Sequence, residues 1–151
     1  MTTAKGMNLE KHANAANLAY RKAKKALIMK VPVPILYTRK GLVAQTSTVD
    51  YVGIVDGGTF IAFDAKECKS KTSFPLNNIK QHQLVYLQFV ESLGGIAFFL
   101  IHFTELHKDL AYKTPLALVE KYWRTGIRKS IPTGDFKDEW LVPIDNYLNE
   151  E

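Results

Sequence analysis

The chain has 151 residues, 46% of them hydrophobic and 23% charged, which is the composition of one ordinary globular domain. Its single cysteine, Cys68, excludes an internal disulfide and a cysteine-rich zinc site, and we expect a cytoplasmic protein. No apolar segment has the length of a transmembrane helix, so no membrane partner is expected. The net charge of +5, gathered in several clusters of lysine and arginine, favours a polyanionic partner.

The first predicted element is a helix over residues 8–27, with Asn8 as its N-cap. Apolar residues recur along it at spacings of four and three, which is typical of one buried helix face: Leu9, Ala13, Ala16, Tyr20, Ala23 and Leu27. Glu10 lies at the edge of this stripe in the first turn. It either faces a catalytic site or interacts favourably with the helix dipole.

Two short strands are predicted next. Residues 28–33 contain Pro32 and are followed by Pro34, so they cannot form a central strand. Residues 35–45 are expected to form a further strand or a protruding arm with Arg39-Lys40-Gly41 at its turn. The basic tip of such an arm suits a DNA groove or backbone, and it is equally common in an ordinary hairpin turn.

The strongest local signal is a β-hairpin within residues 48–66. Apolar, β-branched and aromatic runs flank Asp56-Gly57-Gly58, a strong turn sequence. With the turn centred on Gly57, Asp50 lies opposite Asp64, and Lys66 shares a face with Asp64. A two-residue turn would shift the register by one residue and place the two aspartates diagonally.

Two carboxylates this close on apolar strands repel each other, so one takes up a proton or a cation lies between them. Mg²⁺ commonly binds through one or two carboxylates, waters and substrate phosphates. Lys66 beside them can orient a water or stabilise charge on a phosphate. The alternative is a solvated ion pair at the strand ends without a catalytic role.

The remaining elements are a basic loop, a helix, a buried strand, a second helix and a closing segment, over residues 67–73, 78–93, 95–103, 115–123 and 140–143. The first of these helices carries His82 and Gln83 in its first turn. Basic residues in 121–129 either contact DNA or form a solvated face around a buried Trp123. The order α-β-β-β-α-β predicts an α/β fold with a mixed sheet between helices and a site at the strand ends.

Several motifs resemble those of known nucleases. Asp50 followed by Asp64-Ala65-Lys66 resembles the PD-(D/E)xK nuclease pattern. More specific are four longer segments and two pairs, which occur in the order Gly6-Met7-Asn8-Leu9-Glu10, Ser47-Thr48-Val49-Asp50-Tyr51, Phe63-Asp64-Ala65-Lys66-Glu67, Lys71-Thr72-Ser73-Phe74-Pro75-Leu76, His82-Gln83 and Gly94-Gly95. Together they are similar to the RecU family of Holliday junction resolvases, found in Gram-positive bacteria and their phages. The resemblance covers roughly residues 5–103.

This resemblance implies one nuclease domain over residues 1–151, with a restriction-endonuclease-like αβββαβ core, a mixed central sheet flanked by helices and a short arm around 34–46. It implies a Mg²⁺-dependent endonuclease, with Mn²⁺ as a substitute ion, that resolves four-way DNA junctions by paired symmetric nicks. The implied partners are branched DNA, a second copy of the chain in a homodimer and a recombinase.

The resemblance also implies roles for individual residues. The metal site falls on Thr48, Asp50, Asp64 and Gln83, the lysine that stabilises the transition state is Lys66, and Glu10 lies near the site. Lysine and arginine clusters are expected to hold the other phosphates, through Lys5, Arg39, Lys40, Lys69 and Lys71.

The chain departs from the family pattern in three places. Asp64 stands where the family usually has glutamate, the arm is shorter than the family's stalk, and the basic N-terminal tail is nearly absent. Nuclease chemistry is therefore more firmly implied than junction selectivity. The alternatives are a nuclease of the same fold that acts on flaps or nicks, and a non-catalytic DNA-binding accessory protein of recombination.

Overall fold

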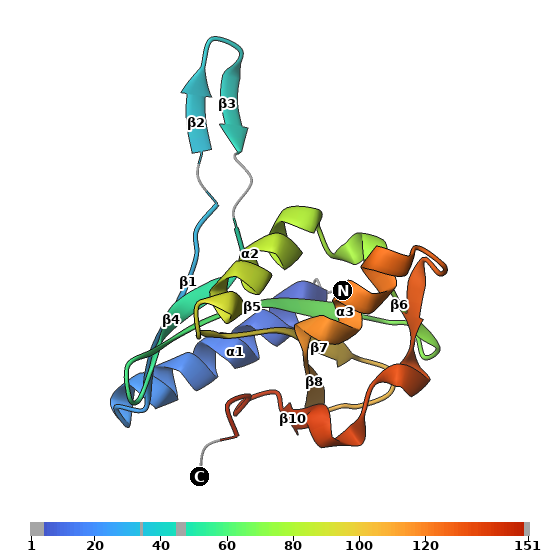
Figure 1. Ribbon diagram of the computed structural model, residues 1–151. Coiled ribbons are helices and arrows are strands. Elements are labelled where there is room, and N and C mark those ends of the chain that lie inside the picture. Colours follow the sequence, from blue (N-terminus) through green and yellow to red (C-terminus); the bar gives the residue numbers. More distant parts are fainter. Residues whose placement is uncertain (1–4, 34, 45–47, 150–151) are drawn as a thin grey trace.

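A computed structural model describes residues 5–33, 35–44 and 48–149 (Figure 1). Its centre is a six-stranded sheet in the order β1-β4-β5-β7-β8-β10. These strands are β1 (Ala26–Lys30), β4 (Tyr51–Val55), β5 (Thr59–Cys68), β7 (Ile96–Phe103), β8 (Leu110–Thr114) and β10 (Leu141–Pro143). β5 and β7 are parallel and the other neighbouring pairs are antiparallel, so the sheet is mixed, as predicted.

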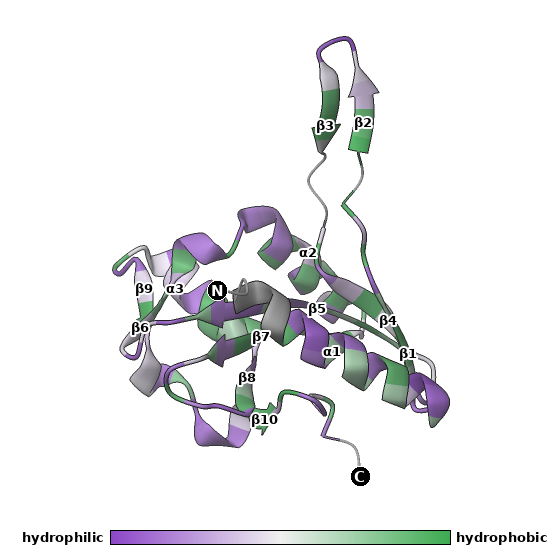
Figure 2. Ribbon diagram, turned by 180° about the vertical axis from the view of Figure 1, so that it is seen from behind, coloured by the Kyte–Doolittle hydropathy of each residue, from purple (hydrophilic) through white to green (hydrophobic). Residues whose placement is uncertain are grey.

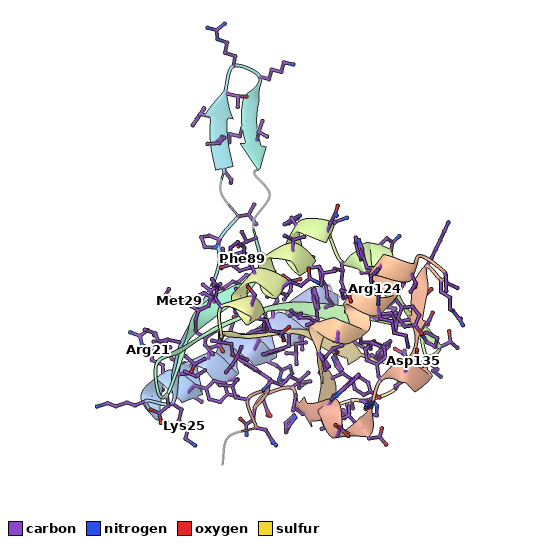
Figure 3. All side chains as sticks on the ribbon, in the orientation of Figure 1. Arg21, Lys25, Met29, Phe89, Arg124 and Asp135 are labelled. Atoms are coloured by element: carbon purple, nitrogen blue, oxygen red, sulfur yellow. The ribbon has the colours of Figure 1, made fainter. Side chains whose placement is uncertain are left out.

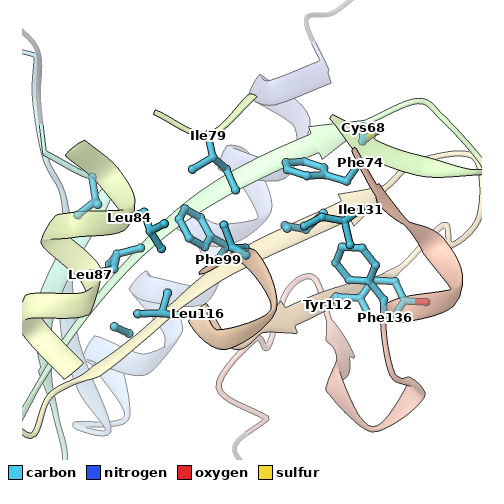
Figure 4. Close-up of a cluster of buried hydrophobic side chains, with 14 of the residues drawn as sticks. Cys68, Phe74, Ile79, Leu84, Leu87, Phe99, Tyr112, Leu116, Ile131 and Phe136 are labelled. Carbon is cyan, nitrogen blue, oxygen red and sulfur yellow. The ribbon is translucent and has the colours of Figure 1, made fainter. Parts of the chain in front are cut away.

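Helices cover both faces of this sheet. On one face, α1 (Lys5–Lys22) packs Leu9 and Ala13 against an aromatic cluster that includes Phe63 and Phe98. On the other face, α2 (Gln81–Ser92) and α3 (Leu116–Thr125) cover a second cluster. Figure 4 shows part of it, with Leu84, Leu87, Leu116 and Phe99 buried together. β5 and β7 are therefore packed on both faces, as expected for the central strands of an α/β fold.

The bounds of the first helix differ from the prediction. α1 begins at Lys5, so Asn8 lies inside it and is not the N-cap, and it ends at Lys22 rather than at residue 27. Lys24 adopts a left-handed conformation with φ 59°, and the Lys25 amide donates to the Tyr20 carbonyl at 2.9 Å. This turn ends the helix, and Leu27 belongs to β1.

β2 (Ile35–Thr38) and β3 (Gly41–Ala44) form a separate hairpin that protrudes from the body (Figure 1). Of the two forms expected for residues 35–45, the described residues form a hairpin, and residues 34 and 45–47 lie outside the described part of the chain. Both strands contain apolar residues, and the tip is hydrophilic (Figure 2). The large apolar side chains of this arm are exposed, namely Ile35, Leu36, Tyr37, Leu42 and Val43.

Three further predicted bounds need correction. The predicted loop at 67–73 begins later, because Glu67 and Cys68 still pair with β7 in strand β5. The helix predicted from residue 78 begins at Gln81, after a 3₁₀ turn over Leu76–Asn78. The strand predicted at 28–33 is β1, which begins at Ala26 and ends at Lys30.

The last part of the chain adds a small two-stranded ribbon beside α3. It consists of β6 (Ser73–Pro75) and β9 (Ser130–Pro132), which are antiparallel. Two 3₁₀ turns, Thr133–Asp135 and Asp138–Trp140, then lead to β10. Within the described residues, every helix is too short or too polar to cross a lipid bilayer.

Candidate active site

The hairpin of β4 and β5 has the register predicted from a turn centred on Gly57. Val55 pairs with Thr59 and Tyr51 with Phe63. Gly57 and Gly58 have φ of 94° and 89°, a region that residues with side chains rarely occupy. Asp50, directly before Tyr51, therefore lies beside Asp64, directly after Phe63.

The backbone and side chains of the two aspartates hold each other in place. Asp64 Oδ1 accepts a hydrogen bond from the Asp50 amide at 2.9 Å. In return, Asp50 Oδ2 accepts one from the Ala65 amide at 3.0 Å. Lys66 Nζ lies 2.9 Å from Asp64 Oδ2, and the Asp64 side chain is only 1% exposed. The three predicted residues thus form one cluster, which we call the Asp50–Asp64–Lys66 cluster.

Asp64 is held in an environment that disfavours its charge. Burial first, and then the negative charge of Asp50, raise the pKa of Asp64 to about 6, although Lys66 and the Asp50 amide oppose the shift. One ammonium group therefore does not fully compensate the two carboxylates. A cation at this point would relieve their repulsion.

The donor set fits a hard divalent cation such as Mg²⁺. The cluster offers carboxylate oxygens from Asp50 and Asp64, and Mg²⁺ sites usually consist of one or two carboxylates with waters and substrate phosphates. Among the described residues, no group of three or more His, Cys, Asp or Glu side chains is placed to hold a metal ion. Any such ion would therefore keep positions for water and a phosphate.

Glu10 lies near the cluster without joining it. Its carboxylate is 3.2 Å from Lys30 Nζ. The pKa of Tyr51 is raised by burial and then by the charges of Glu10, Asp50 and Asp64, which places all three acids around this phenol. The Tyr51 hydroxyl donates to Asn14 Oδ1 on α1 at 3.0 Å. Glu10 therefore holds Lys30 on the α1 side of the sheet.

Thr48 and Gln83, the other two residues expected at the metal site, take no part in the hydrogen bonds of the two aspartates. Thr48 is exposed in the segment before β4. Gln83 Oε1 accepts a hydrogen bond from the Lys80 amide at 2.9 Å and so caps the first turn of α2. Within the described part of the chain, neither side chain forms a hydrogen bond to Asp50 or Asp64.

The basic residues expected to contact DNA are spread over three elements. Arg39 and Lys40 are exposed at the tip of the arm. Lys69 and Lys71 are exposed in the loop that follows β5, the strand of Lys66. Lys5 begins α1, and its side chain lies outside the described part of the structure.

Sequence reasoning missed the position of Glu67. Its Oε2 accepts a hydrogen bond from the Leu9 amide at 2.9 Å, so it ties the start of α1 to β5 directly after Lys66. In a strand, successive side chains point to opposite faces, which puts Glu67 opposite Lys66 and toward α1. The signal was this alternation, which was overlooked because Glu67 was assigned to a loop.

Comparison with known proteins shows the family. The family described as "RecU: Recombination protein U" matches residues 4–148. The chain belongs to the RecU family. A Holliday junction resolvase RecU from Geobacillus sp. (strain WCH70) is 39% identical over 141 residues, which cover 85% of this chain and 70% of that protein. One from Lactococcus lactis subsp. lactis (strain IL1403) is 37% identical, over 95% of this chain and 72% of the relative.

The fold of this RecU-family chain is also found in a solved structure. The 1.6 Å structure of Archaeoglobus fulgidus Hjc, a Holliday junction resolvase from an archaeal hyperthermophile, has a TM-score of 0.52. The similarity covers 90% of this chain and 96% of that one, at 14% sequence identity. It confirms the nuclease-like α/β fold expected from the resemblance. At this identity the likeness concerns the fold alone.

Proposed function

We propose that this RecU-family protein is a Holliday junction resolvase, an endonuclease that cuts four-way DNA junctions by paired symmetric nicks. The observation that carries the proposal is the Asp50–Asp64–Lys66 cluster, in which a buried carboxylate with a raised pKa lies between a second carboxylate and an ammonium group. The proposal places the protein in the cytoplasm as a single nuclease domain, with recombining DNA as its substrate.

In this proposal, Asp50 and Asp64 would hold Mg²⁺, together with the neutral oxygens of Thr48 and Gln83 that the family resemblance implies. When bound, the ion supplies Lewis-acid polarisation of a phosphate and lowers the pKa of a water. The Ala65 amide orients the Asp50 carboxylate, and the Asp50 amide orients that of Asp64. Lys66, only 17% exposed, lies beside Asp64 and stabilises the charge that develops on the phosphate. Glu10 acts at the edge of the site, where its carboxylate positions Lys30.

Lysine and arginine side chains supply the remaining DNA contacts. Arg39 and Lys40 on the arm, and Lys5, Lys69 and Lys71 on the body, hold phosphates around the cut. Each contact made to duplex DNA should release counterions, so affinity should fall steeply with salt.

A homodimer is proposed because a junction has two strands to cut symmetrically. A hollow of about 340 Å³ between α2 and the start of β5 supports this, since Phe60, Tyr86 and Phe89 line it. Phe89 and Leu93 are 63% and 78% exposed, and Phe89 lies at the surface of α2 (Figure 3). An uncharged aromatic surface of this kind is typical of the core of a protein interface, and we assign it to a second copy of the chain.

The test is cleavage of a synthetic four-way junction beside a linear duplex of matching sequence, with Mg²⁺ and with chelator. Wild type should nick the junction symmetrically, and chelator should abolish the nicks. Asp64→Asn should bind the junction without cutting it, whereas Asp56→Asn, in the exposed turn of the same hairpin, should cut normally. Absence of cleavage with any divalent metal would support the non-catalytic alternative instead.

The short arm favours one further candidate, a nuclease of the same fold that cuts flaps or nicked DNA. β2 and β3 have only four residues each, which limits how far the arm reaches into a junction. A panel of junction, flap, nicked and linear substrates separates the two. Preference for flaps or nicks over the junction would replace the resolvase assignment while keeping the Asp50–Asp64–Lys66 chemistry.

A further inference from the structure

A second hollow, of about 440 Å³, lies at the C-terminal end of α3, away from the apolar surface on α2. Pro75 and Leu76 line one part of it, and the rings of Tyr122 and Trp123 line another. Arg128 and Lys129 also line it, and both are exposed. We call this hollow the α3 pocket. It combines apolar and aromatic walls with two adjacent cations.

The cations of the α3 pocket are available to a ligand. Arg124, on α3 nearby, is engaged by Glu120 at 3.0 Å. By contrast, neither Arg128 nor Lys129 forms an ion pair with any described residue. The Tyr122 hydroxyl donates to Asp135, which raises the pKa of Tyr122, and the charge of Arg128 opposes that shift. Arg128 and Tyr122 line the same hollow.

The α3 pocket is built on the segment that leaves the catalytic strand. The Leu76 amide donates to the Lys129 carbonyl at 2.9 Å, and β6 pairs with β9 along the pocket. The loop before β6 is held to the same region, because Thr133 Oγ1 donates to the Lys71 carbonyl at 3.2 Å. A DNA strand that leaves Lys66 along Lys69 and Lys71 would therefore reach this pocket.

We propose that the α3 pocket binds one unpaired nucleotide of a DNA strand, with its base against Trp123 and Tyr122 and its phosphates on Arg128 and Lys129. Aromatic side chains beside basic ones are the chemistry of single-strand binding, where stacking of one base contributes about 1–3 kcal/mol. A duplex keeps its bases paired and presents only phosphates, so it would leave the apolar walls unused. The inference rests on the proposed action on DNA and adds to it a site for unpaired strands.

The test uses tryptophan fluorescence, because base stacking on Trp123 should quench its emission. The chain has two tryptophans, so Trp140→Phe leaves Trp123 as the single reporter. This protein is titrated in chelator with a short oligothymidylate, a duplex of equal length, thymidine monophosphate and inorganic phosphate. We expect saturable quenching by the oligothymidylate, with much weaker effects of the other three.

The reporter protein with Arg128→Ala and Lys129→Ala should bind the oligothymidylate about tenfold more weakly or worse, which corresponds to about 1.4 kcal/mol. The matched control is Arg21→Ala with Lys22→Ala, a second Arg-Lys pair that is exposed at the end of α1; Figure 3 labels Arg21. This control should leave the affinity unchanged. Thermal unfolding of each variant checks that the fold is kept. Binding of a labelled oligothymidylate to Trp123→Leu, measured by fluorescence anisotropy, should show a similar loss of affinity.

Three outcomes would overturn the inference: no quenching by the oligothymidylate, equal quenching by the duplex, or equal quenching by the free mononucleotide. The titration involves neither metal nor cleavage. If the oligothymidylate fails to bind but the protein still cleaves the junction, the α3 pocket is not a single-strand site and the proposed function stands. If the wild-type protein does not cleave the junction, the proposed function is overturned, and what the pocket binds is still decided by the fluorescence titration.

Discussion

Asp64→Asn replaces the buried carboxylate of the Asp50–Asp64–Lys66 cluster with an amide of nearly the same size. The amide oxygen can still accept the hydrogen bond that the Asp50 amide donates to Asp64. The negative charge is removed. We expect this variant to lose cleavage and, in chelator, to be more stable than the wild type.

The magnitude of the stabilisation follows from the pKa of Asp64, which burial and Asp50 raise from 3.8 to about 6. Since one pKa unit corresponds to about 1.36 kcal/mol, the ionised group costs the metal-free fold about 3 kcal/mol. This is an upper value for the gain in Asp64→Asn, because its amide nitrogen faces Lys66 in place of a carboxylate oxygen. The folded-state pKa is the higher one, so the cost is absent below about pH 4 and complete above about pH 6.

The assay is urea unfolding in chelator at pH 8 and at pH 4.5, for wild type, Asp64→Asn and the control Asp56→Asn. At pH 8 the Asp64→Asn protein should have the larger free energy of unfolding, and at pH 4.5 the difference should shrink. Mg²⁺ should stabilise the wild type more than the variant, since binding to the folded state alone adds to stability. Equal stabilities at pH 8, or a difference that grows with acid, would refute this account of the cluster.

Three further predictions concern the scaffold and the arm. In Gly53→Ala the new Cβ would lie 2.1 Å from the Leu27 carbonyl oxygen, so we expect a loss of at least about 1–3 kcal/mol in urea unfolding, whereas Gly134→Ala, with open space around it, should be nearly neutral. Burial lowers the pKa of His102 from 6.5, so the contribution of this group to stability should fall as pH drops below about 6.5, and the stability of His102→Asn relative to the surface control His82→Asn should rise over that range. Replacing Arg39 and Lys40 by alanine should weaken junction binding more than binding to linear duplex in a mobility-shift titration, and an equal effect on both would show that the arm does not select junctions.

The parts of the fold that the sequence predicted are those fixed by local pattern. Asp56-Gly57-Gly58 determines the register of β4 and β5, because the backbone at both glycines requires positive φ. This register brings Asp50 to Asp64, so the pair was predictable from a stretch of the chain that forms one hairpin. The continuous apolar run of β7 was predictable for the same reason, since a strand buried on both faces needs no alternation.

The parts that were missed depend on contacts between distant segments. α1 ends at a left-handed Lys24, a residue type that gives no signal for such a turn. β5 extends through Glu67 because this residue still pairs with β7, and its carboxylate accepts a hydrogen bond from the Leu9 amide, 58 residues away. The hydrogen bond from the Lys80 amide to Gln83 Oε1, which caps α2, was not predicted. Strand β8 was not predicted at all, because five residues of mixed polarity form it only by pairing with β7 and β10.

The two faces of β5 have opposite energetic roles at the site. Toward α1, Phe63 stacks between Tyr51 and Phe98, with ring centroids 4.9 and 4.8 Å away. Toward the other face, the next residue is Asp64, whose ionisation is unfavourable. Stacked aromatic pairs contribute about 0.5–1.5 kcal/mol each beyond the area they bury. Aromatic stacking on one face therefore offsets part of the free-energy cost of ionising Asp64 on the other. Because Phe63 and Tyr51 are partners across β4 and β5, the same stack keeps Asp50 beside Asp64.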